Sequence, residues 1–147
     1  NNLISARNVL GWTFYRTGEY DSAKVIYEEA LNLADKLGDT IQISRLLNNI
    51  GLIYAKNNDY VQALNNYNLS LQIKIKLGDK RGIGGILNNM GNIYRTKADY
   101  EKSMQCYNRS LKIQERLDNK QNKLLLAIII IFKLLKNFKG LNKWKKF

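Results

Sequence analysis

The chain of 147 residues contains no histidine, no proline and a single cysteine, Cys106. Without histidine it lacks the side chain most often used as a general base and as a metal ligand, which argues against most hydrolase and zinc sites. One cysteine cannot form an intramolecular disulfide, so a reducing cytoplasm is the expected compartment. The absence of proline removes the residue that most often interrupts a helix, and it therefore favours long helices.

Acidic residues are also scarce, with 12 against 24 lysines and arginines, and the charge is unevenly placed. Residues 119–147 contain eight lysines and no acid, which gives this segment two thirds of the net charge of +12. A lysine-rich end can contact nucleic acid or anionic lipid without sequence preference. Because acids are dispersed through the rest of the chain, we expect no specific nucleic-acid partner.

An eight-residue segment recurs at a spacing of forty residues. Residues 47–54 read LNNIGLIY, residues 87–94 read LNNMGNIY, and a more divergent copy occupies residues 7–14. A fixed period of this size is typical of repeat arrays. We expect three full repeats, at about residues 1–39, 40–79 and 80–118, followed by a different segment at 119–147.

Apolar residues at helical spacing fill each repeat, and short polar segments interrupt them. Gly38-Asp39 and Gly78-Asp79 are typical of a helix end followed by the N-cap of the next helix, because glycine adopts the left-handed conformation and aspartate accepts from free backbone N–H groups. Asp59 is a further expected N-cap. We predict helices at about residues 3–17, 20–37, 40–56, 60–77, 80–97 and 100–117. Asp118-Asn119 occupies the place of a third Gly-Asp pair.

Equivalent positions indicate how the two helices of a repeat pack together. A glycine recurs on the first helix, and a small residue and a tyrosine recur on the second. These columns are Gly11, Gly51 and Gly91; Ala23, Ala63 and Ser103; and Tyr27, Tyr67 and Tyr107. Large-against-small pairing lets antiparallel helices interdigitate, with the glycine permitting close approach. One pair cannot bury both of its faces, so successive pairs must stack.

The columns resemble the tetratricopeptide repeat, whose first helix carries Trp-x-x-Leu-Gly-x-x-Tyr and whose second carries Ala-x-x-x-Phe. In the second repeat, Gly51 and Tyr54 match the first pattern, and Ala63 and Tyr67 match the second. The forty-residue period and the Leu-Asn-Asn opening resemble the longer variant of kinesin light chains, G-protein-signalling modulators and modules attached to bacterial sensor kinases. The proline that closes each family repeat is missing here.

The resemblance covers about residues 3–118, and it implies an all-α, right-handed solenoid of antiparallel helix pairs with three full repeats and a degenerate fourth. In this family the first helices line a concave groove that holds an extended peptide or a helix. The resemblance therefore implies a non-catalytic module, without cofactor or metal, that binds a protein or peptide. The matching groove positions are Asn8, Trp12, Arg16, Arg45, Asn48, Asn49, Leu52, Lys56, Asn88, Asn89, Asn92 and Arg95.

Asparagine is the main residue type among these positions. Its side chain both donates and accepts, so a ladder of Asn48, Asn49, Asn88 and Asn89 can pair with a peptide backbone whatever the peptide sequence. Arginine and lysine beside the ladder favour an acidic segment or a terminal carboxylate. The alternative is that some of these asparagines bond between neighbouring helices and only fix the stacking.

Residues 124–135 form an apolar run that only Lys133 interrupts. Twelve residues are too few for a membrane-spanning helix, which needs about twenty. One interpretation is the first helix of a degenerate fourth repeat, in which Ile129 replaces the expected glycine. The alternatives are a membrane-surface or tethering segment within 124–147 and a disordered or miscoded end. Exposed apolar surface at 124–135 would also permit self-association.

Two functions fit these observations. The first is an adaptor or scaffold that presents its groove to a partner protein. The second is a sensory or regulatory module of a larger signalling protein, such as a sensor kinase or transcriptional regulator, whose output domain lies outside this chain. An enzyme fits least, because no set of general acid, base and nucleophile can be assembled from the sequence.

Overall fold

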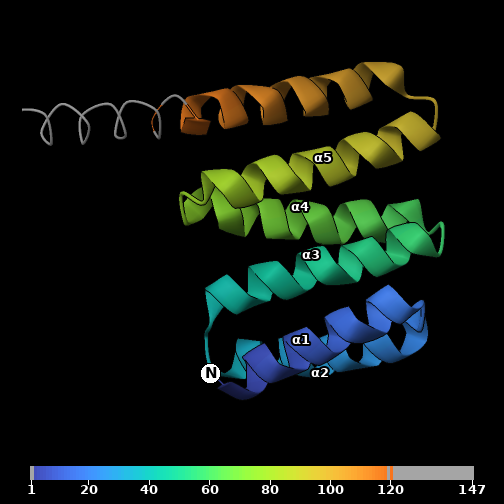
Figure 1. The fold of residues 1–147 in the computed structure, drawn as a ribbon, viewed down its shortest axis with the longest axis vertical. Helices are drawn as coiled ribbons and strands as arrows, with labels where there is room; N and C mark the ends of the chain where they lie inside the picture. The colour runs from blue at the N-terminus through green and yellow to red at the C-terminus, as the bar shows by residue number, and fades with distance from the viewer. Residues whose placement is uncertain (1, 119, 121–147) are drawn as a thin grey trace, which may run out of the picture.

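A computed structural model describes residues 2–118 and 120, which form six successive helices (Figure 1). The helices are α1 (Asn2–Thr17), α2 (Tyr20–Lys36), α3 (Thr40–Lys56), α4 (Tyr60–Lys76), α5 (Lys80–Thr96) and a sixth helix over residues 100–118. No strand occurs in this part of the chain. The prediction of an all-α array of helix pairs is confirmed.

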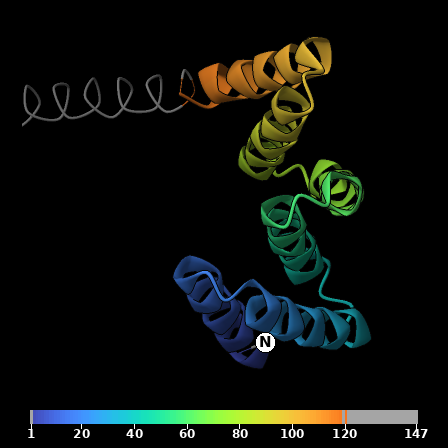
Figure 2. The same cartoon turned by 90° about the vertical axis from the view of Figure 1, so that its right-hand side faces the viewer.

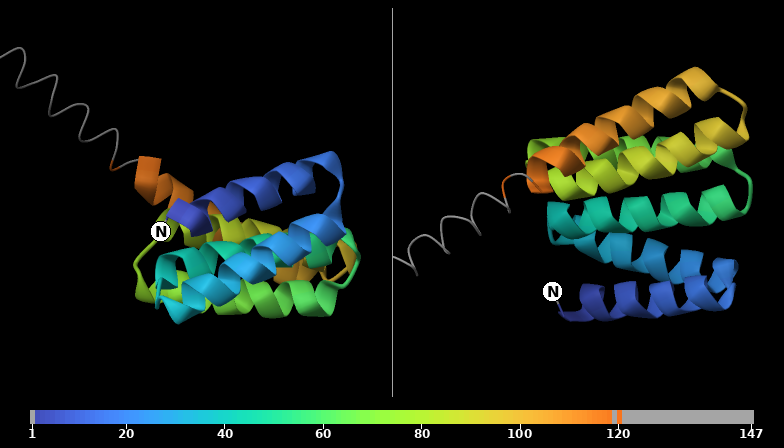
Figure 3. Two further views of the ribbon diagram at one scale, coloured as in Figure 1. Left: turned by 90° about the horizontal axis from the view of Figure 1, so that it is seen from below. Right: turned by 45° about the horizontal axis from the view of Figure 1, so that its top comes forward.

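Successive helices run antiparallel, so their turns lie alternately along two opposite sides of the stack (Figure 3). Each of the five turns between the six helices contains one residue in the left-handed conformation, at Gly18, Gly38, Asn58, Gly78 and Ala98. Such a residue ends a helix because its backbone turns away from the helical path. Glycine adopts this conformation without a steric penalty, whereas Ala98, with φ of 58°, adopts it at a cost.

Aspartate caps the start of four helices, as predicted for Asp39 and Asp59. The side chain of Asp39 accepts from Gln42 N at 3.1 Å, and that of Asp59 accepts from Gln62 N at 3.1 Å. Asp79 and Asp99 accept in the same way from the backbone N–H three residues later. The repeating turn chemistry therefore sets the helix boundaries locally, repeat by repeat.

The end of the sixth helix differs from the two equivalent ends before it. Asp118 stands at the position of Gly38 and Gly78, and it remains helical, as does Lys120. Without a glycine at this position, no left-handed residue ends the helix there. The sixth helix therefore extends at least to Asp118, one residue beyond the predicted end at about residue 117.

Each helix pair is closed by a tyrosine ring that lies over a glycine. A Cβ atom added to Gly11 would lie 2.6 Å from Cε1 of Tyr27, and one added to Gly91 would lie 2.7 Å from Cε1 of Tyr107. The glycine columns thus permit close approach as predicted. In each pair the tyrosine ring fills the space beside the glycine. In the second pair, the backbone oxygen of the small residue Ala63 also lies 3.3 Å from a Cβ atom added to Gly51.

The pairs stack into a curved array, and its curvature is visible in the rotated view of Figure 2. One apolar cluster joins the first pair to α3 through Ala30, Leu46 and Ile50. A second joins α4, α5 and the sixth helix through Tyr67, Met90 and Cys106. α1 also touches α3, and α3 touches α5, whereas α2 and α4 are not in contact. The first helices of the repeats therefore line the inner side of the curve.

In the described part of the chain, no helix is both long enough and apolar enough to cross a membrane. The predictions for residues 119 and 121–147, namely a degenerate fourth repeat, a membrane-surface segment or a self-associating run, lie outside the described residues.

Candidate binding groove

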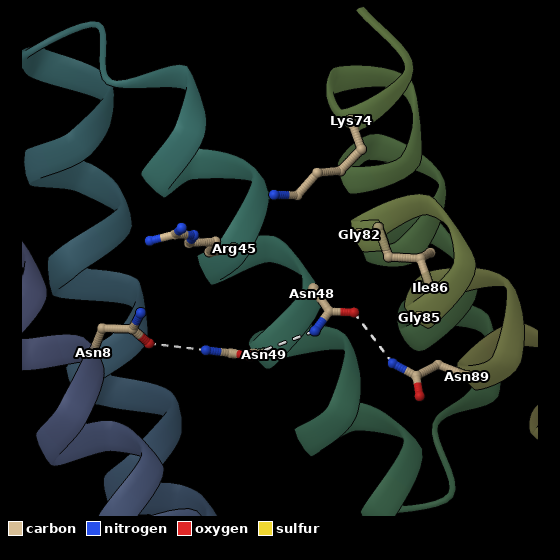
Figure 4. A pocket seen from close by; sticks show the side chains of 9 residues that line it. All are labelled: Asn8, Arg45, Asn48, Asn49, Lys74, Gly82, Gly85, Ile86 and Asn89. Carbon is tan, nitrogen blue, oxygen red and sulfur yellow. Dashed lines mark hydrogen bonds between the residues drawn. The ribbon is translucent and has the colours of Figure 1, made fainter. Parts of the chain in front are cut away.

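Two cavities lie along the inner face formed by the first helices. The first has a volume of about 430 Å³, and the second about 300 Å³. Asn89 lines both cavities, so they meet at this residue. The first cavity is lined by Asn8, Arg45, Asn48, Asn49, Lys74, Gly82, Gly85, Ile86 and Asn89 (Figure 4). The second is lined by Tyr15, Leu52, Ala55, Lys56, Tyr60, Tyr67, Asn89, Asn92, Ile93 and Thr96.

Four asparagines cross the floor of the first cavity as a hydrogen-bonded chain (Figure 4). Asn49 Nδ2 donates to Asn8 Oδ1 at 2.9 Å, which links α3 to α1. Asn48 Nδ2 donates to Asn49 Oδ1 at 3.5 Å, within α3. Asn89 Nδ2 donates to Asn48 Oδ1 at 3.2 Å, which links α5 to α3. The asparagine chain therefore joins α1 to α3 and α3 to α5, which are the first helices of successive repeats.

This chain leaves specific hydrogen-bonding groups open. Asn89 Oδ1 accepts no hydrogen bond from the described residues, and in Figure 4 it points away from Asn48. The Nδ2 group of Asn8 likewise donates to no described residue, and each carboxamide NH₂ carries a second proton. The asparagine chain thus links neighbouring first helices, and it still offers an acceptor at one end and donors along its length.

The structure separates Asn88 from the predicted ladder. Asn88 is exposed and lines neither cavity, whereas its equivalent in the second repeat, Asn48, makes two of the three links. The difference arises because Asn48 lies between the asparagines of α1 and α5. Asn88 would need an asparagine from a following first helix, and the described residues contain none.

The other predicted groove residues fall into two groups. Arg45 lines the first cavity, and Leu52, Lys56 and Asn92 line the second. Asn92 Oδ1 also accepts from the hydroxyl of Tyr107 at 2.7 Å. Three exposed residues line neither cavity, and these are Trp12, Arg16 and Arg95. Of these, Trp12 stacks on the ring of Tyr15, with the ring centroids 5.2 Å apart.

Sequence reasoning missed Lys74, a lysine of α4 whose side chain is only 8% exposed. Its Nζ lies 2.7 Å from Asp79 Oδ2, while Asp79 Oδ1 accepts from Gly82 N at 2.9 Å. The hydrogen bond from Lys74, followed by that from the Gly82 backbone, holds the pKa of Asp79 below its usual value of 3.8. The carboxylate therefore remains ionised and neutralises Lys74.

A substitution pattern between repeats could have revealed this lysine. Lys74 of the second repeat stands where the first repeat has the buried Ala34, and Gly82 of the third repeat stands where the second has Gln42. A Cβ atom at position 82 would lie 2.6 Å from Asp79 Oδ2 and 2.9 Å from Lys74 Cδ. The glycine thus makes room for the lysine and its carboxylate partner, and the two changes belong together.

The first cavity carries positive charge. Apart from Lys74, which Asp79 neutralises, its charged lining residue is Arg45, which is exposed. Arg45 forms no ion pair with any residue that the structure describes. An unpaired guanidinium beside open amide donors suits a carboxylate or another anion.

The second cavity is lined mainly by aromatic and apolar residues, together with the polar side chains of Lys56, Asn89, Asn92 and Thr96. Tyr15, Tyr60 and Tyr67 line it together with Leu52 and Ile93. Burial is the main cause that raises the pKa of Tyr15 and of Tyr67, so both hydroxyls stay protonated at neutral pH and can donate hydrogen bonds. Such a surface suits a large apolar or aromatic side chain.

No group of three or more potential metal-ligating side chains occurs in residues 2–118 and 120. Cys106 is buried, and burial raises the pKa of its thiol. A buried thiol with a raised pKa is a poor nucleophile.

Comparisons with known proteins identify the repeat. A family model described as tetratricopeptide repeat matches residues 42–122, and a second with the same description matches residues 3–37. No curated protein matches the sequence. Among solved structures, the TPR domain of Arabidopsis FLU has a TM-score of 0.73 at 22% identity, covering 78% of this chain and 97% of that chain.

Two longer solved chains contain a similar array. BtubC (BKLC) from P. vanneervenii has a TM-score of 0.72 at 22% identity, covering 78% of this chain and 46% of that chain. The TPR2AB domain of yeast Sti1, in its complex with pHSP90, has a TM-score of 0.66 at 22% identity, covering 86% of this chain and 49% of that chain. The chain thus spans less than half the length of these two neighbours, and the likeness shows the fold alone.

Proposed function

We propose that this chain, which belongs to the tetratricopeptide-repeat family, is a non-catalytic module that binds a peptide or helical segment of a partner protein along its inner face. The observation that carries this proposal is the meeting of two chemically different cavities at Asn89. A peptide lying along the groove would contact both cavities. The solved complex of the yeast Sti1 TPR2AB domain with pHSP90 supports this class of partner for a similar fold.

The asparagine chain is suited to hold a peptide backbone. Its open groups include an acceptor at Asn89 Oδ1 and a donor at Asn8 Nδ2. Backbone N–H and C=O groups of an extended segment can pair with them regardless of the peptide sequence. Because the four side chains already restrain one another, binding immobilises fewer free rotamers than it would with isolated asparagines.

The two cavities supply sequence preference. Arg45 in the first cavity favours an acidic side chain or a terminal carboxylate, since a guanidinium can form two parallel hydrogen bonds to a carboxylate. Tyr15, Tyr60 and Tyr67 in the second cavity favour a large apolar side chain. The preferred ligand is therefore a segment that carries one acidic and one apolar anchor.

The test is a selection of peptides from a random library on the full chain, followed by fluorescence anisotropy of the selected peptides. Arg45→Glu reverses the charge in the first cavity, and Tyr60→Ala removes part of the wall of the second. Arg109→Glu is the matched control, because Arg109 is exposed on the sixth helix and lines neither cavity.

We expect selected peptides to be acidic and to lose about tenfold or more in affinity with Arg45→Glu, which corresponds to about 1.4 kcal/mol. Affinity should be unchanged with Arg109→Glu. Equal losses with both arginine variants would mean that net charge alone attracts the peptides, and the groove assignment would be wrong. A selection that yields no binder would contradict the peptide-binding function.

A further inference from the structure

A further cavity lies on one side of the stack, where the sixth helix ends beside the turn between α4 and α5 (Figure 1). Its volume is about 490 Å³, which is larger than that of either groove cavity. None of its lining residues lines a groove cavity, so it is a separate site. The residues that carry its charge are Lys80, Arg81, Arg116 and Lys120, and we refer to it as the cationic cavity.

These four cations come from two elements. Lys80 and Arg81 belong to the first turn of α5, whereas Arg116 and Lys120 lie at the end of the sixth helix. All four side chains are exposed, and none forms an ion pair with any residue that the structure describes. The start of one helix and the end of the next therefore bring four unneutralised charges to one hollow.

The cationic cavity lacks a free carboxylate among the described residues that line it. Asp79 lines it, but its charge is already neutralised by Lys74, whose Nζ lies 2.7 Å away. Glu115 and Asp118 belong to the same stretch of the sixth helix, and neither lines the cavity. Residues 119–147 contain no acidic side chain. Because like charges held together repel one another, the cavity favours an anion from solution.

The preceding junction between repeats shows that the fold does not need these charges. Thr40 and Ile41 occupy the columns of Lys80 and Arg81 one repeat earlier, and they begin α3 as the two cations begin α5. Both are exposed. Since neutral side chains serve equally well at this helix start, packing and capping do not explain the lysine and the arginine.

We propose that the cationic cavity binds a compact anion that carries two or more phosphate groups. Arginine forms paired hydrogen bonds to phosphate oxygens, and lysine adds a point charge. α5 begins at the cavity, so the partial positive charge of its N-terminal end adds to that of the side chains. One phosphate group carries a charge of at most about −2, so four cations favour more than one phosphate. A soluble polyphosphate and the headgroup of a phosphorylated inositol lipid both present this chemistry.

The test titrates inorganic pyrophosphate into the full chain at fixed ionic strength, by isothermal titration calorimetry. In the cavity variant, Lys80→Thr and Arg81→Ile introduce the residues of the preceding repeat. In the control variant, Lys97→Thr and Arg109→Leu remove the same number of charges, again with residues that earlier repeats carry in these columns. Lys97 and Arg109 are exposed and line neither the groove cavities nor the cationic cavity.

We expect the affinity for pyrophosphate to fall by about tenfold or more in the cavity variant and to stay unchanged in the control variant. Citrate, a carboxylate anion of similar charge, should bind more weakly than pyrophosphate. Equal losses in both variants, or equal affinity for citrate, would show that net charge alone attracts anions and would overturn the proposal. Absence of pyrophosphate binding to the unmodified chain would overturn it as well.

A second arm identifies the source of the phosphate groups. Sedimentation compares vesicles that contain a bisphosphorylated inositol lipid with phosphatidylserine vesicles of equal surface charge. If the cavity variant loses binding to the inositol-lipid vesicles alone, the ligand is a lipid headgroup. If it loses pyrophosphate while all chains bind vesicles equally, the ligand is soluble, and either result supports the proposal. The groove proposal is tested independently by the selected peptides, because the substituted residues line neither groove cavity.

Discussion

The ring of Tyr67 occupies the space that a side chain at Gly51 would need. A Cβ atom added to Gly51 would lie 2.7 Å from Cε1 and 2.8 Å from Cδ1 of this ring. Tyr67 is almost fully buried, so the ring cannot move into solvent without uncovering the second apolar cluster. The contact therefore holds α3 and α4 at their observed separation.

We expect Gly51→Ala to destabilise the protein, although alanine is the better helix former. The propensity gain is about 1 kcal/mol, whereas overpacking a core contact costs typically about 1–3 kcal/mol. The net loss should be about 1 kcal/mol, and Gly51→Leu should lose more. Urea unfolding followed by circular dichroism measures both.

Gly85→Ala is the matched control, because Gly85 also lies within a helix and a Cβ added there meets nothing within 4 Å. Here the propensity gain is unopposed, so stability should rise by about 0.5–1 kcal/mol. If both variants were stabilised, Tyr67 would have to accommodate the added methyl group, and the glycine column would not control helix separation.

The helix boundaries could be predicted because they are set locally. The Asp59 cap and the left-handed residue at Gly78 act within a few residues of their own position, so a sequence pattern is enough to place them. The observed α3 and α4 begin where the pattern predicts, at Thr40 and Tyr60.

The groove could be predicted only in outline. The sequence indicates which helices line it, but not that Asn49 reaches Asn8 while Asn48 reaches Asn89. That choice depends on the stagger between neighbouring repeats, which no single repeat contains. Lys74 was missed because it belongs to a second helix, and the resemblance places the groove on the first helices alone.

Ala98 carries a local strain that a glycine would relieve. Its φ of 58° is equivalent to the left-handed positions at Gly18 and Asn58 in the earlier repeats. This conformation costs an alanine roughly 1–2 kcal/mol, and glycine avoids most of that cost while losing about 0.4–1 kcal/mol through its more flexible unfolded chain. We expect Ala98→Gly to raise the thermal midpoint and Gly18→Ala to lower it. A lower midpoint with Ala98→Gly, or a higher one with Gly18→Ala, would contradict the left-handed backbone at these turns.

The ion pair between Lys74 and Asp79 should make stability depend on pH. The pKa of Asp79 is lowered in the folded protein, chiefly by the hydrogen bond from Lys74. A lowered carboxyl pKa stabilises the fold above the pKa of the unfolded chain, near 3.8, and this contribution is lost as the pH falls through the folded value. Asp79→Asn can still cap α5, so it tests the charge separately from the cap.

We expect Asp79→Asn to destabilise the protein by about 1–3 kcal/mol at pH 7, because it leaves the buried ammonium of Lys74 without its hydrogen-bonded carboxylate. Lys74→Ala should cost less, since Asp79 is partly exposed and alanine is the residue of the first repeat at this position. The deficit of Asp79→Asn should shrink in urea titrations as the pH falls below 3.8 and through the lowered pKa of the folded carboxyl. A deficit that stays constant from pH 7 to pH 2.5 would show that charge does not contribute.

Asn48 and Asn88 occupy the same column of successive repeats and provide a matched pair. Asn48 takes part in two hydrogen bonds of the asparagine chain, whereas Asn88 is exposed and makes none with the described residues. A neutral hydrogen bond contributes about 0.5–1.5 kcal/mol, and the 3.5 Å link to Asn49 is at the weak end. Asn48→Ala should therefore lower stability by about 1 kcal/mol, and Asn88→Ala should leave it within about 0.5 kcal/mol of the original.

The same two variants separate the structural role of the asparagine chain from its role in peptide binding. Asn48→Ala should also lower the affinity for the selected peptides. Asn89 loses the acceptor, Asn48 Oδ1, that orients its carboxamide toward the open side of the groove. Asn88→Ala should leave peptide affinity unchanged, since Asn88 lines neither cavity. If Asn48→Ala lowers the thermal midpoint but leaves affinity intact, the asparagine chain serves only to fix the stacking. A loss of affinity with Asn88→Ala would instead place the ligand on a different surface of α5.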